Sequence, residues 1–486
     1  MIQEAVLEER LAKLEAAKSW SPRVVSRLET LIRSGSEEAV FRINPIRFAC
    51  ERGIAESEAI DLFLNATLAG LFEMDWLLLC PVCSDVVANF RSLRAVENHF
   101  HCNLCHADYD PTLDDFIAVT FTVSPTVRGI RYHDPDSLSV EDYVFHYKVT
   151  PEGLTDEGVP WIEILRSSLR GGARIGPGEV AAFDFEAGPG MILGFDLESD
   201  AFFLINVAGE RSAEAQSASV VIRLGVCEPS EGRLAPGRVR FEVKSETDRA
   251  AIFGVMQLPP GAPLNHGPLK FEPFLSGKRL LMTQTFRDNF RSEVIHAAEG
   301  ITVRDVTILF TDLKGSTALY ERIGDLNAYV QVQRHFEKLL DVTMRRNGAI
   351  NKTIGDAVMA AFPTPIDAVQ AALEMREAAE DLNRDRSQRD FILKIGIHRG
   401  AAIAVTLNDR LDYFGQTANI ASRVQNLAGG DEVCLTEDVR RAAGVEEALA
   451  PYAIRSAEAE LKGVEQRTPV YFVGAPLPRE NEAGQS

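Results

Sequence analysis

The stretch FTDLKGST, residues 310–317, follows an apolar run and precedes a helical pattern, which predicts a strand that turns into a helix. A small-residue turn at a helix start suits phosphate, because free backbone N–H groups point outward and the helix dipole is positive there. This turn, however, begins with Asp312, whose carboxylate repels phosphate. Its side chain either caps the helix or meets a metal ion that lies between carboxylate and phosphate. The second interpretation requires another acid elsewhere in the chain.

A candidate for this second acid lies in NKTIGDAVMAAF, residues 351–362. Two strand-like runs flank Gly355 and Asp356, a pair suited to a two-residue hairpin turn. We expect the hairpin tip to bring Asp356 to the end of the strand that carries Asp312, where two carboxylates need cations between them. Taken alone, Gly-Asp is also ordinary turn chemistry.

A third stretch, LDYFGQTANIASRVQ at residues 411–425, predicts a strand end with Asp412, a turn at Gly415 and a helix. Asn419 and Arg423 are four residues apart, so they project from the same face of this helix. With TDLKGST and the run that joins Lys352 to Asp356, this pattern resembles the class III adenylate and guanylate cyclases. The resemblance keeps its order and internal spacing through residues 303–475, and it implies an α/β ferredoxin-like catalytic domain.

The resemblance also implies a role for individual positions. Asp312 and Asp356 bind two Mg²⁺ or Mn²⁺ ions per active site, helped by the backbone carbonyl of Leu313. Arg423 stabilises charge that grows on the α-phosphate, and Asn419 positions the ribose. The phosphates receive backbone N–H groups from the turn Leu313, Gly315, Ser316 and Thr317, and a charge from Lys462. After GIHRG, Ala401 and Ala402 stand where some members have an arginine, so that contact is missing or comes from Arg399.

Base choice follows from hydrogen bonding at Lys352 and Asp412. Lysine donates and aspartate accepts, which complements the N1 acceptor and the exocyclic amine of adenine, whereas guanine leaves both groups mismatched. The resemblance implies the same substrate, ATP, and the products 3′,5′-cyclic AMP and pyrophosphate. It also implies a head-to-tail homodimer, in which one chain gives the metal acids and the other gives the base-reading residues, Asn419 and Arg423. The alternatives are a guanylate or promiscuous cyclase and a catalytically silent nucleotide-binding signalling module.

Two cysteine pairs indicate a separate metal site. Cys80 and Cys83 form one CxxC knuckle, and after 18 intervening residues Cys102 and Cys105 form another. Four thiolates fill a tetrahedral shell, so we expect one structural Zn²⁺ per chain in a zinc ribbon. The nearby His99, His101 and His106 are interpreted as surface or second-layer residues, and Cys50, Cys227 and Cys434 as ordinary packed thiols. A zinc-dependent DNA-binding regulator is a further alternative.

Composition limits the partners. The chain has 486 residues and a net charge of −20, which argues against broad binding to nucleic acid or anionic membranes. No stretch approaches the roughly 18 uninterrupted apolar residues of a spanning helix, and the first residues lack the order of a signal peptide. We therefore expect a cytoplasmic protein with no membrane span and no nucleic-acid partner.

The changes in pattern along the chain predict a multidomain α+β protein. A linker helix is expected from the apolar stripe Phe286, Phe290 and Val294. The predicted parts are a helical N-terminal segment (1–79), the zinc ribbon (80–111), a β-rich and possibly regulatory domain of unknown ligand (112–280), the linker helix (281–302), the cyclase domain (303–475) and a disordered tail (476–486).

Overall fold

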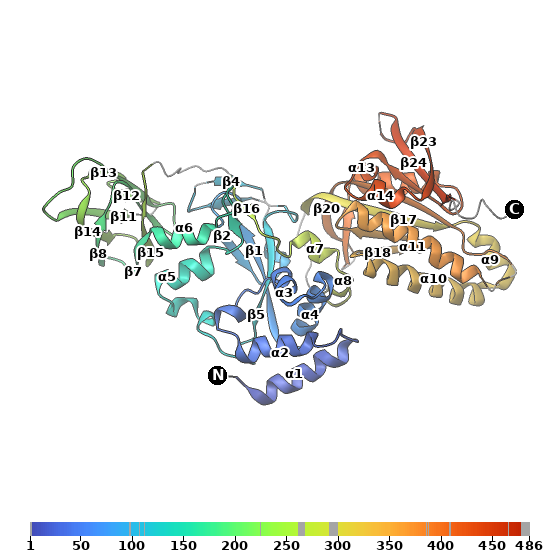
Figure 1. Ribbon diagram of the computed structural model, residues 1–486, viewed down its shortest axis with the longest axis horizontal. Helices are drawn as coiled ribbons and strands as arrows, with labels where there is room; N and C mark the ends of the chain where they lie inside the picture. Colours follow the sequence, from blue (N-terminus) through green and yellow to red (C-terminus); the bar gives the residue numbers. More distant parts are fainter. Residues whose placement is uncertain are drawn as a thin grey trace, which may run out of the picture. The chain divides into compact units, whose positions relative to one another are not determined.

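A computed structural model of the chain describes residues 2–96, 99–105, 107–110, 112–223, 225–260, 268–290, 300–384, 386, 388–407, 410–464 and 466–477. The chain divides into two compact units (Figure 1). The first unit holds residues 1–91, 97–111 and 116–275, and the second holds 92–96, 112–115 and 276–486. Among the described residues, no helix has the length and apolar character needed to cross a membrane.

In the first unit, N-terminal helices pack on a small antiparallel sheet of order β2-β1-β5 (Figure 1). Phe63 lies at the centre of the contact, its ring 5.1, 5.3 and 5.2 Å from those of Phe48, Phe72 and Phe121. The elements are α1 (Glu4–Ala17), α2 (Val24–Ser34), α3 (Pro45–Arg52), α4 (Glu56–Leu68), β1 (Phe72–Leu79), β2 (Val86–Phe90) and β5 (Ile117–Val123).

Residues 72–79 correct the expectation that the segment 1–79 is helical throughout. Helix α4 ends at Leu68, and FEMDWLLL forms strand β1. Every residue of this strand except Glu73 is buried, because β1 lies between β2 and β5 and both of its faces are covered. A continuous apolar run of this length does not by itself distinguish a central strand from a buried helix.

A β-sandwich forms the largest part of the remainder of the first unit, which confirms the β-rich character expected for this part of the chain. Two sheets, of order β13-β10-β9-β15-β7 and β12-β11-β14-β8, share a core in which the ring of Phe203 lies 4.6 Å from Phe241 and 5.9 Å from Phe253. The strands are β7 (Leu169–Ile175), β8 (Val180–Ala187), β9 (Gly190–Asp196), β10 (Phe202–Val207), β11 (Gln216–Arg223), β12 (Val226–Glu228), β13 (Glu231–Leu234), β14 (Gly237–Ser245) and β15 (Ala251–Leu258).

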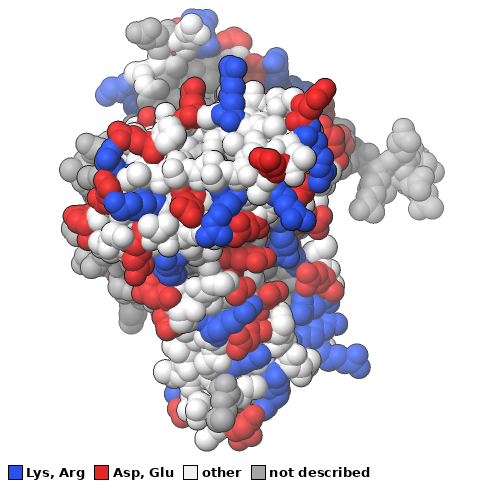
Figure 2. All heavy atoms as spheres, turned by 90° about the vertical axis from the view of Figure 1, so that its left-hand side faces the viewer, with Lys and Arg blue, Asp and Glu red and all other residues white. Residues whose placement is uncertain are grey.

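The exposed side of this sandwich carries charges of both signs. Strand β14 alternates buried and exposed residues along its length, so its charged side chains share one face. On that face Arg240 pairs with Asp184 of β8 at 3.2 Å, and Lys244 pairs with Glu246 at 2.8 Å. Figure 2 shows blue and red side chains interspersed over this side, without a patch of one sign.

The outer surface of the β9-containing sheet is covered by helices. Val140 and Leu165 pack there with Phe195 and Met256. Val140 belongs to α5 (Val140–Tyr143) and Leu165 to α6 (Trp161–Ser168). Short strand pairs complete the unit: β3 (Phe100–Cys102) with β4 (Ala107–Tyr109), and β6 (Gly153–Leu154) with β16 (Lys270–Phe271).

The second unit is built on a mixed sheet of order β18-β19-β17-β20-β22-β24-β23, with β21 paired to β20 (Figure 1). Alternate residues of β22 face opposite sides, so Leu435 joins the core under α10 and α11, while Cys434 packs with Val424 of α12. Its strands are β17 (Ile301–Leu313), β18 (Ala349–Ile354), β19 (Ala357–Phe362), β20 (Leu393–Leu407), β21 (Arg410–Phe414), β22 (Glu432–Thr436), β23 (Tyr452–Ala459) and β24 (Thr468–Pro476). Its helices include α9 (Ser316–Ile323), α10 (Asp325–Arg345), α11 (Pro365–Asn383), α12 (Gln416–Leu427), α13 (Glu437–Arg440) and α14 (Val445–Leu449).

Of the predicted linker helix 281–302, the structure describes residues 281–290 and 300–302. Helix α7 (Gly277–Leu281) and helix α8 (Gln284–Asn289) precede Phe290, and β17 begins at Ile301. The rings of Phe286 and Phe290 stack at 5.2 Å, but Val294, the third member of the predicted stripe, lies outside the described residues. The same holds for residues 478–486 of the predicted tail.

Candidate active site

Two carboxylates meet where strand β17 ends. Thr311 of β17 pairs with Val358 of β19, so Asp312 follows beside the hairpin tip that carries Asp356. The tip is the two-residue turn expected from the sequence, and Gly355 has a φ of +65° there, which favours glycine. The structure thus brings together the two acids that the sequence separates by more than forty residues.

The environment of these acids suits a cation. Burial and the neighbouring charge of Asp356 raise the pKa of Asp312. One carboxylate oxygen of Asp356, Oδ2, is buried and has no hydrogen-bond partner among the described residues. An unpaired buried oxygen next to a second carboxylate is costly unless a positive charge is bound there, so this donor set fits a hard divalent ion.

The turn after Asp312 leads directly into a helix. Leu313 is buried in the core, Gly315 precedes the helix with a φ of +84°, and α9 begins at Ser316. The first backbone N–H groups of a helix have no acceptor within it, so those of Ser316 and Thr317 are free for an anion. The predicted phosphate turn therefore lies next to the acid pair.

Lys352 and Asp412 form a second pair. The Lys352 Nζ atom donates to Asp412 Oδ2 at 2.5 Å, and Asp412 Oδ1 accepts from the backbone N–H of Tyr413 at 2.8 Å. Asp412 is buried on β21, whereas Lys352 on β18 is partly exposed. The two residues predicted to read the base are therefore in direct contact.

Helix α8 connects the strands that carry this pair, which the sequence did not indicate. The Gln284 side chain accepts from the backbone N–H of Ile350 in β18 at 2.8 Å. Arg287 donates to the carbonyl of Leu411 in β21, and its burial lowers the pKa of its guanidinium. Gln284 and Arg287 are three residues apart and contact two strands from a single helix. The only signal in the sequence was that the polar residues Gln284 and Arg287 lie in the same stretch, 284–290, as two members of the predicted apolar stripe.

Helix α12 carries Asn419 and Arg423. It packs closely on β20, since a Cβ added at Gly396 would come within 2.1 Å of the Gln425 backbone nitrogen. Asn419 is exposed, and Arg423 is half-buried with its guanidinium beside Gly463. Lys462 is exposed and adjacent to that glycine in the chain. The structure therefore brings Arg423 to the segment of Lys462, while Asn419 forms no side-chain hydrogen bond with other described residues.

Arg399 is engaged elsewhere in the unit. Its Nε and Nη2 atoms donate to both oxygens of Asp305, at 2.6 and 2.8 Å. A bidentate pair of this kind holds a guanidinium in place. Ala401 and Ala402 follow in β20, where Ala402 is buried. Arg399 is therefore bound to Asp305 and does not replace the arginine that some cyclases have at the position of Ala401 and Ala402.

The four cysteines of the CxxC pairs also come together. Their sulfur atoms all lie within 4.8 Å of one another, with Cys80 to Cys105 at 3.4 Å and Cys83 to Cys102 at 3.6 Å. Such spacings fit four thiolates around one ion at about 2.3 Å each. This cluster could hold a metal.

The histidines near this cluster make other contacts. His101 lies 2.8 Å from Asp108 and 3.0 Å from Asp200, and His99 lies 3.1 Å from Asp110, while His106 is outside the described residues. Of the remaining cysteines, Cys227 and Cys434 are buried, and burial raises the pKa of both thiols to about 12. Cys50, in the last turn of α3, is exposed, which corrects its interpretation as a packed thiol.

Comparison with known proteins identifies the class of the second unit. Residues 300–474 match the adenylate and guanylate cyclase catalytic domain, so the second unit carries a class III cyclase domain. Residues 7–288, more than half of the chain, match a family of unknown function, DUF5939. The chain belongs to this family, with a cyclase catalytic domain at its C-terminal side.

The curated relatives are adenylate cyclases of modest identity. One from Anabaena cylindrica is 29% identical over 189 residues, which cover 36% of this chain and 38% of the relative. Adenylate cyclase 2 of Rhizobium meliloti is 31% identical over 130 residues, 24% of this chain and 36% of the relative. The matches thus span little more than a third of each relative. Among solved structures, the adenylyl cyclase CyaB from P. aeruginosa is 20% identical, with a TM-score of 0.33, over 37% of this chain and 97% of that one.

Proposed function

We propose that this protein is an adenylate cyclase that converts ATP to 3′,5′-cyclic AMP and pyrophosphate. The observation that carries the proposal is the pair of Lys352 and Asp412, in contact at 2.5 Å within a cyclase domain. The curated relatives from Anabaena cylindrica and Rhizobium meliloti, both named adenylate cyclases, support the same substrate.

The base is selected by hydrogen bonding. Lys352 donates to N1 of adenine, and Asp412 accepts from the exocyclic amine. In the absence of a nucleotide, each group satisfies the other, so neither is left as an unpaired charge. Guanine presents the reverse pattern of donor and acceptor at these positions, which leaves desolvated polar groups without partners. The pair thus favours ATP over GTP.

Asp312 and Asp356 hold two divalent cations, Mg²⁺ or Mn²⁺, with the carbonyl of Leu313. When bound, such ions supply Lewis-acid activation of the ribose 3′-hydroxyl and neutralisation of the polyphosphate. The backbone N–H groups of Ser316 and Thr317 bind the β- and γ-phosphates. The unpaired oxygen of Asp356 and the proximity of the two acids support this assignment.

The remaining polar groups act on the reacting atoms. Arg423 donates to the α-phosphate as negative charge builds up in the transition state, where a preorganised donor contributes most. Asn419 binds the ribose and holds its 3′-oxygen in line with the α-phosphate. Lys462, which adjoins the glycine beside Arg423, neutralises the departing pyrophosphate.

The active unit is a head-to-tail homodimer with two shared sites. One chain contributes Asp312 and Asp356, and the partner chain contributes Lys352, Asp412, Asn419, Arg423 and Lys462. Lys352 lies on strand β18 and Asp356 in the hairpin turn that follows this strand, and we assign the two residues to different sites. A monomer therefore lacks a complete site.

Purified protein incubated with Mn²⁺ and either ATP or GTP tests this function. We expect cyclic AMP from ATP and at least tenfold slower turnover of GTP. Lys352→Glu combined with Asp412→Cys removes the adenine pattern and should reverse the preference, while Arg467→Ala, an exposed change, should not. Equal use of both nucleotides would favour a promiscuous cyclase, and nucleotide binding without any product would favour a silent module.

We further propose that the four-cysteine cluster binds one structural Zn²⁺ per chain. With all four positions of the ion filled by thiolates, no site remains for a substrate. Metal analysis should find about one zinc per chain, and Cys80→Ser or Cys102→Ser should unfold the first unit at lower temperature. Cys50→Ser, at an exposed thiol, is the control. Normal folding of the cluster variants without zinc would refute the assignment.

A further inference from the structure

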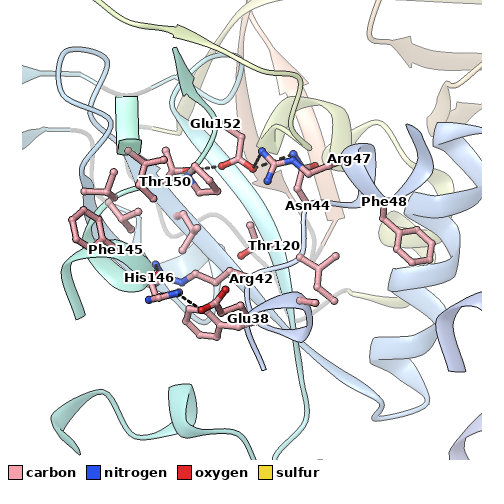
Figure 3. Close-up of a pocket in the computed structure, with 18 of the residues that line it drawn as sticks. Glu38, Arg42, Asn44, Arg47, Phe48, Thr120, Phe145, His146, Thr150 and Glu152 are labelled. Atoms are coloured by element: carbon pink, nitrogen blue, oxygen red, sulfur yellow. Dashed lines mark hydrogen bonds and ion pairs between the residues drawn. The ribbon is translucent and has the colours of Figure 1, made fainter. Parts of the chain in front are cut away.

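A cavity of about 380 Å³ lies in the first unit, beside the sheet of β1, β2 and β5. Strand β5 turns Phe121 towards Phe63 of α4 and the preceding Thr120 towards the opposite face, into the cavity. Phe145 and Phe48 form two of its apolar walls (Figure 3). Its size and its mixture of apolar walls with a few polar groups are those of a small-molecule site.

The polar groups at one end of the cavity are already satisfied. Glu152 is buried, accepts from the Thr150 hydroxyl and pairs with Arg47 at 3.2 Å. Asn44 donates to the carbonyl of Pro273 at 3.0 Å and, through its side-chain oxygen, accepts from the N–H of Ile46. Figure 3 shows this group together on one side. It needs no ligand.

At the other end, His146 has a partner at each ring nitrogen, whereas the carboxylate of Asp75 keeps one oxygen without a hydrogen bond among the described residues. His146 Nε2 lies 3.1 Å from the Tyr132 hydroxyl and 3.4 Å from Glu38, and its Nδ1 lies 2.9 Å from the carbonyl of Asp142. Asp75, on the same sheet face as Thr120, pairs with Arg91 at 3.4 Å. The charge of Asp75 also acts on that of Arg42, but Asp75 is not among the residues that line the cavity.

Two polar atoms that border the cavity have no partner among the described residues. Thr120 is more than nine-tenths buried, and its hydroxyl oxygen forms no hydrogen bond. The Nε atom of Arg42 is likewise buried and unpaired, although its Nη1 atom donates to the carbonyls of His146 and Tyr147 at 3.1 and 2.9 Å. Both open groups can donate a hydrogen bond, and one carries a positive charge, so together they match an anion.

The chain holds Arg42 in place at a conformational cost. Its φ is +45°, a left-handed backbone that a residue with a side chain seldom adopts. Its backbone N–H donates to Thr122, and the next residue, Ile43, forms a bridge with Phe121, so β5 fixes the position. Strain of this kind is maintained where the surrounding structure requires a particular side-chain direction.

We propose that this cavity binds a small organic carboxylate. The carboxylate accepts from Arg42 Nε and from the Thr120 hydroxyl, and the apolar part of the ligand lies against Phe145 and Phe48. The inference concerns the first unit alone and does not depend on the catalytic activity of the second.

Binding of hexanoate and 3-phenylpropionate to the full chain, measured by calorimetry and by thermal shift, tests the proposal. Their neutral amides, hexanamide and 3-phenylpropanamide, keep the shape and remove the charge. We expect at least one carboxylate to bind at least tenfold more tightly than its amide, because a hydrogen bond to a charged group is lost. No binding by either acid, or equal binding of acid and amide, would overturn the proposal.

Two variants locate the site. Thr120→Val removes a hydroxyl that makes no hydrogen bond, so it should leave folding unchanged and weaken carboxylate binding about tenfold. Arg42→Gln should abolish binding, although it also removes the donor to two carbonyls. Thr307→Val, which deletes an equally buried and unpaired hydroxyl in the second unit, is the matched control. Unchanged binding in Thr120→Val and in any folded Arg42→Gln would contradict this site.

Discussion

On the exposed face of the sandwich, acids and bases form close ion pairs, whereas at the candidate active site two acids lie beside each other and the charge of Lys394 acts on Asp312 only from a greater distance. Arg240 pairs with Asp184 and with Glu242, both at 3.2 Å. Among the described residues, Asp312 and Asp356 form no ion pair, and burial together with the charge of Asp356 raises the pKa of Asp312. Pairing on a surface contributes little stability but limits net charge. Two half-buried carboxylates without an ion-pair partner indicate that a bound cation from solution compensates their charge.

The largest expected effect comes from removing one of the unpaired acids. Asp312→Ala and Asp356→Ala should each lower turnover about a thousandfold or more, because each deletes a proposed metal ligand, with the fold intact. Asp184→Ala deletes an acid of the paired kind and should change turnover less than about twofold and stability by less than about 0.5 kcal/mol. Initial rates with ATP and Mn²⁺, together with thermal unfolding, measure both. Near-normal rates in either active-site variant would show that this acid is no more important for turnover than an ion-paired surface acid.

Mixing inactive variants tests whether each active site combines the acids of one chain with residues of a second chain. Asp312→Ala co-expressed with Arg423→Ala places both defects in one site of a mixed dimer and none in the other. With random pairing, about half of the dimers are mixed, so activity should recover to about a quarter of wild type. Asp312→Ala with Asp356→Ala cannot complement in this way. Equal recovery in both mixtures, or none in either, contradicts the shared site.

A smaller effect is expected from helix α8, whose side chains are fully engaged. Gln284→Ala frees the N–H of Ile350 and Arg287→Met frees the carbonyl of Leu411, so the strands of Lys352 and Asp412 lose a support. Turnover of ATP should fall about tenfold, and the ratio of ATP to GTP use should fall with it. Asn289→Ala, at an exposed residue of the same helix, is the control. A loss of stability with an unchanged ratio would assign α8 a purely structural role.

The smallest effect concerns an unpaired group with no place in the site. Both ring nitrogens of His335 in α10 are buried without partners among the described residues, and burial lowers its pKa to about 4. The unfolded chain, with an ordinary pKa near 6.5, therefore takes up a proton that the folded chain refuses, so stability falls as pH drops below about 6.5. Between pH 7.5 and 5.5 this amounts to about 1 kcal/mol.

His335→Phe should remove this part of the pH dependence, because phenylalanine does not titrate and fits against Phe391, whose ring lies 5.4 Å from that of His335. Urea unfolding at the two pH values measures it. An identical pH slope in the variant would show that the histidine has the same pKa in the folded and the unfolded chain. The result distinguishes the active-site acids, which we expect to bind a ligand, from His335, whose burial only reduces stability.

Much of the second unit could be predicted from the sequence, because its signals are local. Asp356 at a two-residue hairpin tip and Asn419 and Arg423 at helical spacing depend on geometry that neighbouring residues set. The four cysteines likewise form a cluster, as their spacing indicated. The roles assigned to these residues stay predictions, and so do the domain boundaries.

The parts that could not be predicted depend on contacts distant in sequence. Strand β1 was expected to be helical because a buried apolar run has no period of its own, and only its neighbours β2 and β5 decide its form. The hydrogen bonds of Gln284 and Arg287 span 66 and 124 residues. Nothing in the sequence connects Thr120 to Arg42 either, since strand pairing brings them to one cavity.

The position of α8 bears on how this protein can be recombined. The match to DUF5939 runs through residue 288 and so includes all of this helix except its last residue, whereas the match to the catalytic domain begins at residue 300. Yet Gln284 and Arg287 bind strands of the second unit. A catalytic fragment that begins where its family match begins would lack helix α8 and its hydrogen bonds to β18 and β21. A transplant of the N-terminal family region onto another cyclase would carry α8 to strands that it does not match. Any exchange of modules in this lineage must therefore move α8 with the catalytic part.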